Sequence, residues 1–213
     1  MDDFFSPLRI AGLVVMWLSL GVHEWAHAWS AFKLGDYTAK ALGRLTLNPF
    51  AHVDLIGTFL LPLMGVPFGW AKPVPIDPSR FRRGVSMSYG MMLTAAAGPI
   101  SNFVLATMAI VADAVLWRVA PGAMAGALGD VVVIAISTNI VLGVFNFIPI
   151  PPLDGSRVVN HFLPLSLRGT WAQIERLGIF LPIMFIYALR MTGLDPFGPI
   201  LRVVGLVMGL LRP

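Results

Sequence analysis

Residues 10–32 read IAGLVVMWLSLGVHEWAHAWSAF, an apolar run long enough to cross a bilayer as one helix. Three ionisable residues interrupt the run: His23, Glu24 and His27. Ionisable groups are costly inside a membrane span, so by default they mark functional positions. This stretch therefore predicts a membrane protein and indicates where its chemistry lies.

The composition of the whole chain agrees with a membrane protein. Of its 213 residues, 57% are hydrophobic and 12% are charged, and the mean hydropathy is +0.79. Soluble domains carry about 25% charged residues, so this chain has too few to coat a water-facing surface. A soluble enzyme, a nucleic-acid-binding protein and a disordered chain are all poor fits. The net charge of +4 is explained by basic cytoplasmic loops, and we expect no nucleic-acid partner.

Two further apolar runs, at residues 89–117 and 131–150, are also expected to span the membrane. The apolar residues 53–70 are broken by prolines and glycines, and we expect a re-entrant segment that returns to the side it left. Loop charge sets the orientation. Seven basic residues occur between residues 32 and 89, which places this region on the cytoplasmic side: Lys33, Lys40, Arg44, Lys72, Arg80, Arg82 and Arg83.

The predicted fold is an all-α polytopic membrane protein with a core of three transmembrane helices and the re-entrant segment. A small β element is expected on the cytoplasmic side, from residues 38–47 and 71–76, and extra helices at the C-terminus. We expect a single integral-membrane domain over residues 1–213, with its core at 10–160 and a C-terminal helical extension at 161–213. The predicted location is the inner (cytoplasmic) membrane, with the site facing the cytoplasmic side.

The sequence His23-Glu24-Trp25-Ala26-His27 is an HExxH motif. On a helix, residues four apart lie on the same face, so both imidazoles can bind one Zn²⁺. Glu24 lies about 100° around the helix from His23, and its predicted role is general base towards the attacking water. We expect one zinc ion per chain.

A hydrolytic zinc site needs a third protein ligand, and the chain contains no cysteine. The candidates are Asp154, His52, Asp54, Asp77, Asp113 and His161. Asp154 follows three prolines in NFIPIPPLDG, residues 146–155, and the predicted topology places it level with the two histidines. The alternative is that Asp154 only begins a turn or caps the following helix.

Three motifs taken together, HEWAH, GPISN and NFIPIPPLDG, resemble the site-2 protease family of intramembrane zinc metalloproteases, peptidase family M50. The resemblance covers about residues 10–160. NPFAHVD at 48–54 and GWAKPV at 69–74 look like the small bacterial branch of that family. The chain has no room for the PDZ-like module or the nucleotide-sensing domain that other members carry.

The resemblance implies cleavage of peptide bonds within or beside a transmembrane helix of a substrate protein. It implies zinc ligands at His23, His27 and Asp154, with Glu24 catalytic, and it places Asn102 and Asn146 in the site. An Asn side chain can donate hydrogen bonds to an oxyanion, whereas Asn102 could equally link two helices. His52 could contact substrate or be satisfied by loop backbone.

The run Lys72, Pro73, Val74, Pro75 and Ile76 is expected to form an edge strand that holds an unwound substrate by β-augmentation. A plain interfacial loop is the alternative. Two rival functions also stay open: a catalytically silent membrane scaffold, and a metal or proton transporter. The intact Glu24 argues against a catalytically silent scaffold. A transporter would favour ionisable groups spread along a path through the membrane.

Overall fold

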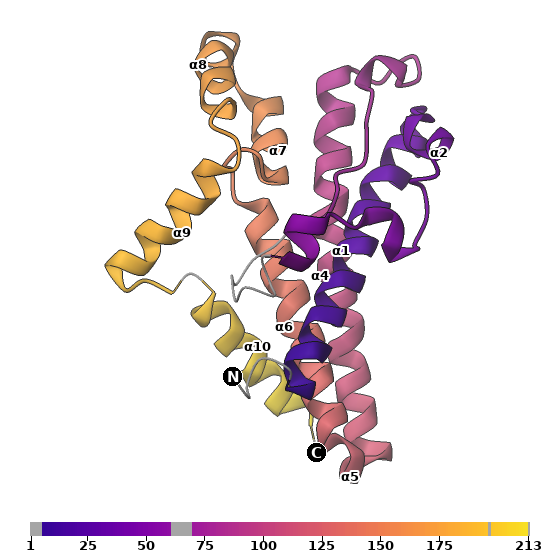
Figure 1. Ribbon diagram of the computed structural model, residues 1–213, viewed down its shortest axis with the longest axis vertical. Helices are drawn as coiled ribbons and strands as arrows, with labels where there is room; N and C mark the ends of the chain where they lie inside the picture. The colour runs from indigo at the N-terminus through magenta and orange to yellow at the C-terminus, as the bar shows by residue number, and fades with distance from the viewer. Residues whose placement is uncertain (1–5, 61–69, 196, 213) are drawn as a thin grey trace.

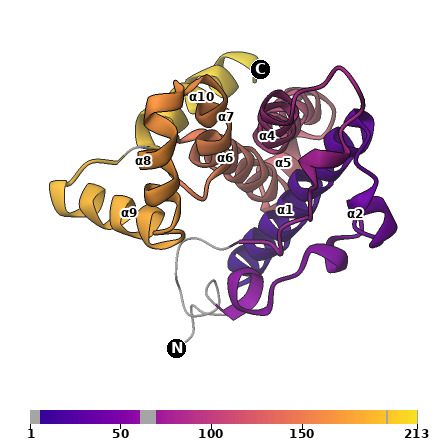
Figure 2. The ribbon, with the colours of Figure 1, turned by 90° about the horizontal axis from the view of Figure 1, so that it is seen from above.

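A computed structural model describes residues 6–60, 70–195 and 197–212 as an assembly of helices (Figure 1). Three long helices, α1, α4 and α6, lie side by side, and the C-terminal helices flank α6 on the side away from α2 (Figure 2). The elements are α1 (Pro7–Leu34), α2 (Thr38–Ala41), η1 (Pro49–His52), η2 (Leu55–Leu60), η3 (Pro78–Arg80), α4 (Met87–Val119), α5 (Pro121–Met124), α6 (Ala127–Phe147), α7 (Asp154–Phe162), α8 (Leu165–Glu175), α9 (Phe180–Thr192) and α10 (Gly198–Leu211).

Two of these helices, α4 with 33 residues and α6 with 21, are long and apolar enough to cross a membrane. A third span is possible if α8 and α9, bent by 84° at their junction, count as one. Helix α1 corresponds to the predicted first span. Its 28 residues extend about 42 Å at 1.5 Å per residue. The chain is therefore a membrane protein, as predicted, and the crossing of α1 stays a prediction.

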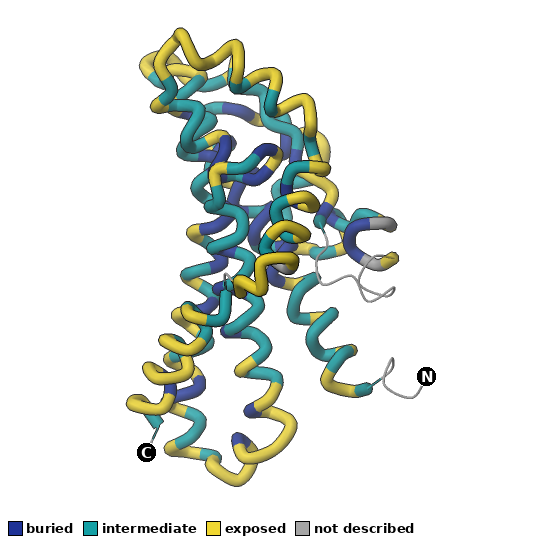
Figure 3. The backbone as a smooth tube through the Cα atoms, turned by 90° about the vertical axis from the view of Figure 1, so that its left-hand side faces the viewer, coloured by how far each residue is buried: buried dark blue, intermediate teal, exposed yellow. Residues whose placement is uncertain are grey.

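Helix α1 has a residue suited to capping at each end. Ser6 precedes Pro7, and the Ser6 side chain accepts a hydrogen bond from the Arg9 N–H. Gly35 ends the helix in the left-handed conformation, at φ 108°. The buried residues of α1 all lie at or beyond Ser19, so only its C-terminal half is enclosed by protein (Figure 3).

An apolar core joins the C-terminal helices to the central ones. Ala106 of α4, Ile136 and Ile140 of α6 and Met208 of α10 form one buried cluster. The predicted C-terminal helices are present as α7 to α10. The contacts of α7 and α10 with α4 and α6 support a single domain, which stays a prediction.

The small β element is not found among residues 6–60, 70–195 and 197–212, where no strand is formed. Residues 38–47 form helix α2 and a turn instead. Asp36 accepts hydrogen bonds from the backbone N–H and the hydroxyl of Thr38, which favours the start of a helix. Gly43, at φ 68°, then turns the chain.

Residues 71–77 form no strand, and most of their N–H groups are absent or directed elsewhere. Pro73 and Pro75 have no N–H. The N–H of Val74 donates to Glu24, and that of Asp77 donates to Asp36. A β ladder would need these same groups.

The predicted re-entrant segment, residues 53–70, is described only at its ends, because residues 61–69 lie outside the described part of the chain. The two ends meet. Trp70 N–H donates to the Gly57 carbonyl at 3.2 Å, and the Thr58 hydroxyl donates to the Trp70 carbonyl at 3.0 Å. Asp54, one of the candidate zinc ligands, instead accepts from the Gly57 N–H at 2.8 Å near the start of η2. A re-entrant path requires such a meeting of ends, and the path itself stays a prediction.

An ion pair fastens α10 to α4. Asp113, 1% exposed, accepts two hydrogen bonds from Arg212, both 2.9 Å long. Replacing Arg212 by Ala would leave a buried carboxylate without its partner. We expect the free energy of unfolding to fall by about 1–3 kcal/mol, less than for a fully enclosed pair because Arg212 is partly exposed. Unfolding in detergent micelles followed by circular dichroism would measure this.

A paired variant tests the cause. Asp113→Leu combined with Arg212→Ala removes both charges, so it should recover part of the stability lost in Arg212→Ala alone. A double variant that is less stable than Arg212→Ala would contradict the assignment of the loss to an unpaired carboxylate.

Candidate metal centre

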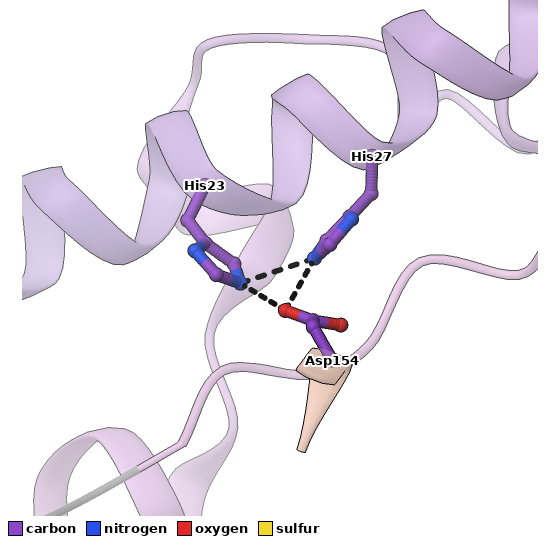
Figure 4. Close-up of side chains that lie close together, drawn as sticks. All are labelled: His23, His27 and Asp154. Atoms are coloured by element: carbon purple, nitrogen blue, oxygen red, sulfur yellow. Dashed lines mark hydrogen bonds and ion pairs between the residues drawn. The ribbon is translucent and has the colours of Figure 1, made fainter. Parts of the chain in front are cut away.

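Three side chains from two distant parts of the chain converge beside α1 (Figure 4). His23 Nε2 lies 3.0 Å from His27 Nε2 and 3.1 Å from Asp154 Oδ2, and His27 Nε2 lies 3.2 Å from the same oxygen. The histidines are one helical turn apart on α1, as HExxH predicts. Asp154 is the first residue of α7, so its carboxylate faces the histidines instead of capping the helix.

The outer nitrogens of both imidazoles are held by groups that can only accept. His23 Nδ1 donates to Asn102 Oδ1 at 2.7 Å, and His27 Nδ1 donates to the Thr94 carbonyl at 2.7 Å. In a neutral imidazole, the Nε2 atom then carries a lone pair. Two nitrogen lone pairs and a carboxylate oxygen therefore face one another about 3 Å apart.

This arrangement fits a metal ion. Three acceptor atoms held together repel one another unless a cation lies between them. Tetrahedral zinc with bonds of 2.0–2.1 Å separates its ligand atoms by about 3.3 Å, close to the observed triangle. Hydrogen bonds to the far side of ligating histidines are typical of metal sites, because they fix the tautomer and the ring orientation.

Helix α4 approaches the imidazoles closely at Gly98. A Cβ at this position would lie 2.4 Å from His27 Nε2 and 2.7 Å from His23 Cε1. The next residue, Pro99, lacks an N–H and loosens the helix in the turn whose Thr94 carbonyl binds His27. Gly98 thus leaves space for the two rings, and Pro99 lacks the N–H that the Ala95 carbonyl would accept in a regular helix.

Asn102 and Asn146, both predicted in the site, lie in different settings. Asn102 is 0% exposed, and both ends of its amide have partners, since its Nδ2 donates to Asn139 at 3.0 Å. This favours a linking role between helices. Asn146 donates one hydrogen bond to the Leu142 carbonyl of its own helix and lines the cavity beside the metal centre.

His52 lies apart from the three converging side chains. It is 1% exposed, its Nε2 donates to the Thr46 carbonyl at 2.9 Å, and its own carbonyl accepts from the Lys72 N–H. Its Nδ1 lies 3.4 Å from Arg44 Nη2, so loop backbone and Arg44 together satisfy its ring, close to one of the two sequence-based alternatives.

Two other candidate ligands also lie outside the triangle. His161 contacts Ser88 near the surface, and Asp113 pairs with Arg212.

Asp77, another candidate ligand, lies in the loop before η3. Hydrogen bonds from the hydroxyl and the backbone N–H of Ser79 hold the pKa of the exposed Asp77 carboxyl below its ordinary value. Its carboxylate thus caps a turn and does not join the metal centre.

Asn139 is a site residue that the sequence reasoning missed. It is buried, accepts from Asn102, and donates to Ser19 Oγ at 3.0 Å, so it links α4, α6 and α1. The sequence does carry a signal for it: Asn139 is a strongly polar residue inside an apolar span, where such side chains usually hydrogen-bond across helices.

A cavity of about 1160 Å³ opens beside the metal centre. Its wall includes the three converging side chains together with Glu24. Apolar residues supply much of the rest, from α1, α6 and α9 and from residues 70–76: among them Leu13, Met16, Val141, Phe145, Pro182, Phe185, Ile186, Trp70 and Val74. Hydrolytic chemistry here would therefore take place at the edge of an apolar space.

Comparison with known proteins agrees with this geometry. The family model for peptidase family M50 matches residues 119–189, which include Asp154. A Bacillus subtilis protein named "Putative zinc metalloprotease YwhC" is 37% identical over 194 residues, covering 87% of this chain and 86% of that protein. The chain belongs to peptidase family M50. The predicted family and enzyme class, a metalloprotease, are confirmed.

Relatives of lower identity match a similar share of this chain and a smaller share of their own length. A Mycolicibacterium smegmatis protein named "Putative zinc metalloprotease Rip2" is 25% identical over 86% of this chain and 71% of its own length. Its namesake from Mycobacterium tuberculosis strain H37Rv is 27% identical over 85% and 70%. No solved structure has significant similarity to the chain.

The close packing at Gly98 gives a test of the M50 metal centre. In Gly98→Ala the new methyl group would overlap both imidazoles, so we expect at least about tenfold weaker binding of Zn²⁺. Competition with a chromogenic chelator would measure the affinity. Gly122→Ala is the control, since nothing lies within 4 Å of a Cβ there. Equal affinities in the two variants would contradict the packing argument.

Proposed function

We propose that this chain is an intramembrane zinc metalloprotease that hydrolyses peptide bonds within or next to the transmembrane segments of membrane proteins. One observation carries the proposal. The lone pairs of His23, His27 and Asp154 converge with separations of 3.0–3.2 Å at the wall of an apolar cavity that Glu24 also lines. The relatives' names, "Putative zinc metalloprotease YwhC" and "Putative zinc metalloprotease Rip2", support zinc as the metal.

Zinc, when bound, acts as a Lewis acid and lowers the pKa of a water molecule to about 7. The residues of the chain do the rest. His23, His27 and Asp154 hold the ion, and Asn102 and Thr94 keep the two imidazoles in the required tautomer. Glu24 accepts a proton from the attacking water and delivers it to the departing amine nitrogen, so that one water and one peptide bond give a carboxylic acid and an amine.

Asn146 is the better candidate to stabilise the oxyanion. It lines the cavity, and only one of its two amide N–H groups is used within its own helix. The side-chain oxygen of Asn102 already accepts a hydrogen bond from His23, and its amide NH₂ donates one to Asn139. We therefore assign Asn146 to the reacting carbonyl and Asn102 to the orientation of His23.

The distribution of charge supports the proposed orientation in the membrane. The loops near α2 carry the basic residues Lys33, Lys40, Arg44, Lys72, Arg80, Arg82 and Arg83, whereas the link at α5 has only Arg118 beside it. Because basic loops stay on the cytoplasmic side, the α2 end faces the cytoplasm and the metal centre opens nearer to that side. The proposed location is the inner membrane.

The arrangement disfavours transport of ions or protons. Such a path needs ionisable groups at successive depths of the membrane. Here His23, Glu24, His27 and Asp154 gather in one place. Asp113, on the more distant half of α4, is neutralised by Arg212.

Glu24→Gln tests the reaction. The amide cannot take a proton, so we expect cleavage to fall by at least about 100-fold, the lower end of general-base contributions, with zinc still bound. The assay uses zinc-loaded enzyme in liposomes with a library of single-span peptides, read by mass spectrometry, and zinc is measured by atomic absorption. Full activity in Glu24→Gln, or no cleavage of any peptide by the unaltered chain, would contradict the proposed function.

The third ligand is tested separately. Asp154→Ala removes one of three donors, so we expect the zinc content to drop to a small fraction of that of the unaltered chain. His52→Ala is the matched comparison, because His52 binds loop backbone and should leave zinc in place. Retention of zinc in Asp154→Ala together with its loss in His52→Ala would reverse the assignment.

A further inference from the structure

The extended residues 72–77 are fastened to the protein at both ends. At one end, the Lys72 N–H donates to the His52 carbonyl at 2.9 Å, and Arg44 donates to the Lys72 carbonyl at 2.6 Å. At the other end, the Asp77 N–H donates to Asp36 Oδ2 at 2.7 Å. The residues between these anchors are therefore held in a defined place relative to α1.

The middle of this segment binds Glu24. The Val74 N–H donates to Glu24 Oε2 at 2.9 Å, and both residues are buried. Pro73 and Pro75 flank Val74, restrict the backbone to an extended form and have no N–H of their own. Val74 thus offers the one N–H of residues 73–75, and it is directed at the glutamate of the HExxH motif.

Asp36 links this segment back to the helix that carries Glu24. It follows Gly35, the C-cap of α1, and it is 0% exposed. Its Oδ1 accepts from Thr38, and its Oδ2 accepts from the N–H of Asp77. A buried carboxylate is costly unless it is well hydrogen-bonded, and here three donors satisfy it.

We propose that Asp36 is a positioning residue for the general base: it anchors residues 72–77 so that the Val74 N–H holds one carboxylate oxygen of Glu24. The other oxygen is left for proton transfer. Without this contact, Glu24 would sample several rotamers, and fewer of them would face the attacking water. The inference rests on the proposed function, since it matters only if Glu24 is the base.

The same geometry limits the alternative role of this segment as a strand for substrate. In extended backbone, the N–H groups of residues 72, 74 and 76 face one side, and those of 73 and 75 would face the other. The second edge has no donor because both residues are proline. On the first edge, the N–H groups of Lys72 and Val74 are already used by His52 and Glu24. The segment is thus better suited to hold Glu24 than to pair with a peptide.

Two substitutions at position 74 isolate the N–H. Val74→Pro removes the donor between two positions that are already proline, and Val74→Ala keeps the donor and shortens the side chain. With a peptide that the unaltered enzyme cleaves, we expect kcat of Val74→Pro to be about 10–100-fold below that of Val74→Ala, with similar KM and zinc content. Ile76→Pro should lower kcat less than Val74→Pro does.

A second pair of variants changes Asp36 and Thr38, which do not themselves contact Glu24. In Asp36→Asn, the two donors of Thr38 keep the carbonyl oxygen on their side, so the amide NH₂ turns to the Asp77 N–H and cannot accept from it. We expect kcat to fall about tenfold, with KM and zinc content unchanged. Thr38→Val, which removes only the hydroxyl bond to Asp36, is the control and should stay within about twofold of the unaltered enzyme.

The outcomes separate this inference from the proposed function. Equal kcat in Val74→Pro and Val74→Ala, or unchanged kcat in Asp36→Asn, overturns the positioning role, while an inactive Glu24→Gln still supports the protease. A rise in KM at constant kcat in both proline variants would assign the segment to substrate pairing instead. Loss of zinc in Asp36→Asn would show a structural role only. An active Glu24→Gln would defeat the proposed function itself.

Discussion

The convergence of three lone pairs inside a helical membrane protein is the constraint on which the rest of the structure depends. Two imidazoles of α1 and a carboxylate of α7 face one another about 3 Å apart, in surroundings that bury the histidines almost completely. Mutual repulsion of these acceptors favours a positive charge between them. To keep the three side chains in this arrangement, the neighbouring helices must orient each imidazole ring and leave space for both rings.

Helix α4 supplies much of that support. Gly98 lets its backbone approach the imidazoles, the Thr94 carbonyl holds His27, and Asn102 holds His23. The contact of Asn102 with Asn139 extends the support to α6. Polar groups thus share hydrogen bonds where three helices meet, which is how buried polar side chains are made tolerable in a largely apolar bundle.

The proposed base, Glu24, is held in a different way from the proposed metal ligands. Helices orient the histidines, but Glu24 meets backbone from an extended, proline-rich segment. Proline gives this segment stiffness without strand partners, since it limits the backbone and removes donors that would otherwise need acceptors. The same property explains why residues 71–77 form no strand, although their sequence resembles an edge strand.

Several features could be read from the sequence because they depend on short distances along the chain. The long apolar runs gave the central helices, the four-residue spacing placed His23 and His27 on one face, and the C-terminal runs became α9 and α10. Asp154 could also be found, because proline-rich, unwound backbone at membrane depth is tolerated only where it lines a cavity or is buried in protein. Helical periodicity depends only on residues close together in the sequence, so it can be recognised without knowing the tertiary structure.

Other features were decided only by tertiary structure. Residues 38–41 form a short helix and not a strand, and the ring of His52 is held by the Thr46 carbonyl and Arg44. The partners of His23 are 79 and 131 residues away, and those of Glu24 and Asp36 are 50 and 41 residues away. No local pattern encodes such pairs. The sequence by itself determined the metal-binding motif and the membrane fold, whereas helix packing and loop anchoring decided which groups orient that motif, because hydrogen bonds between distant residues exist only once the chain is folded.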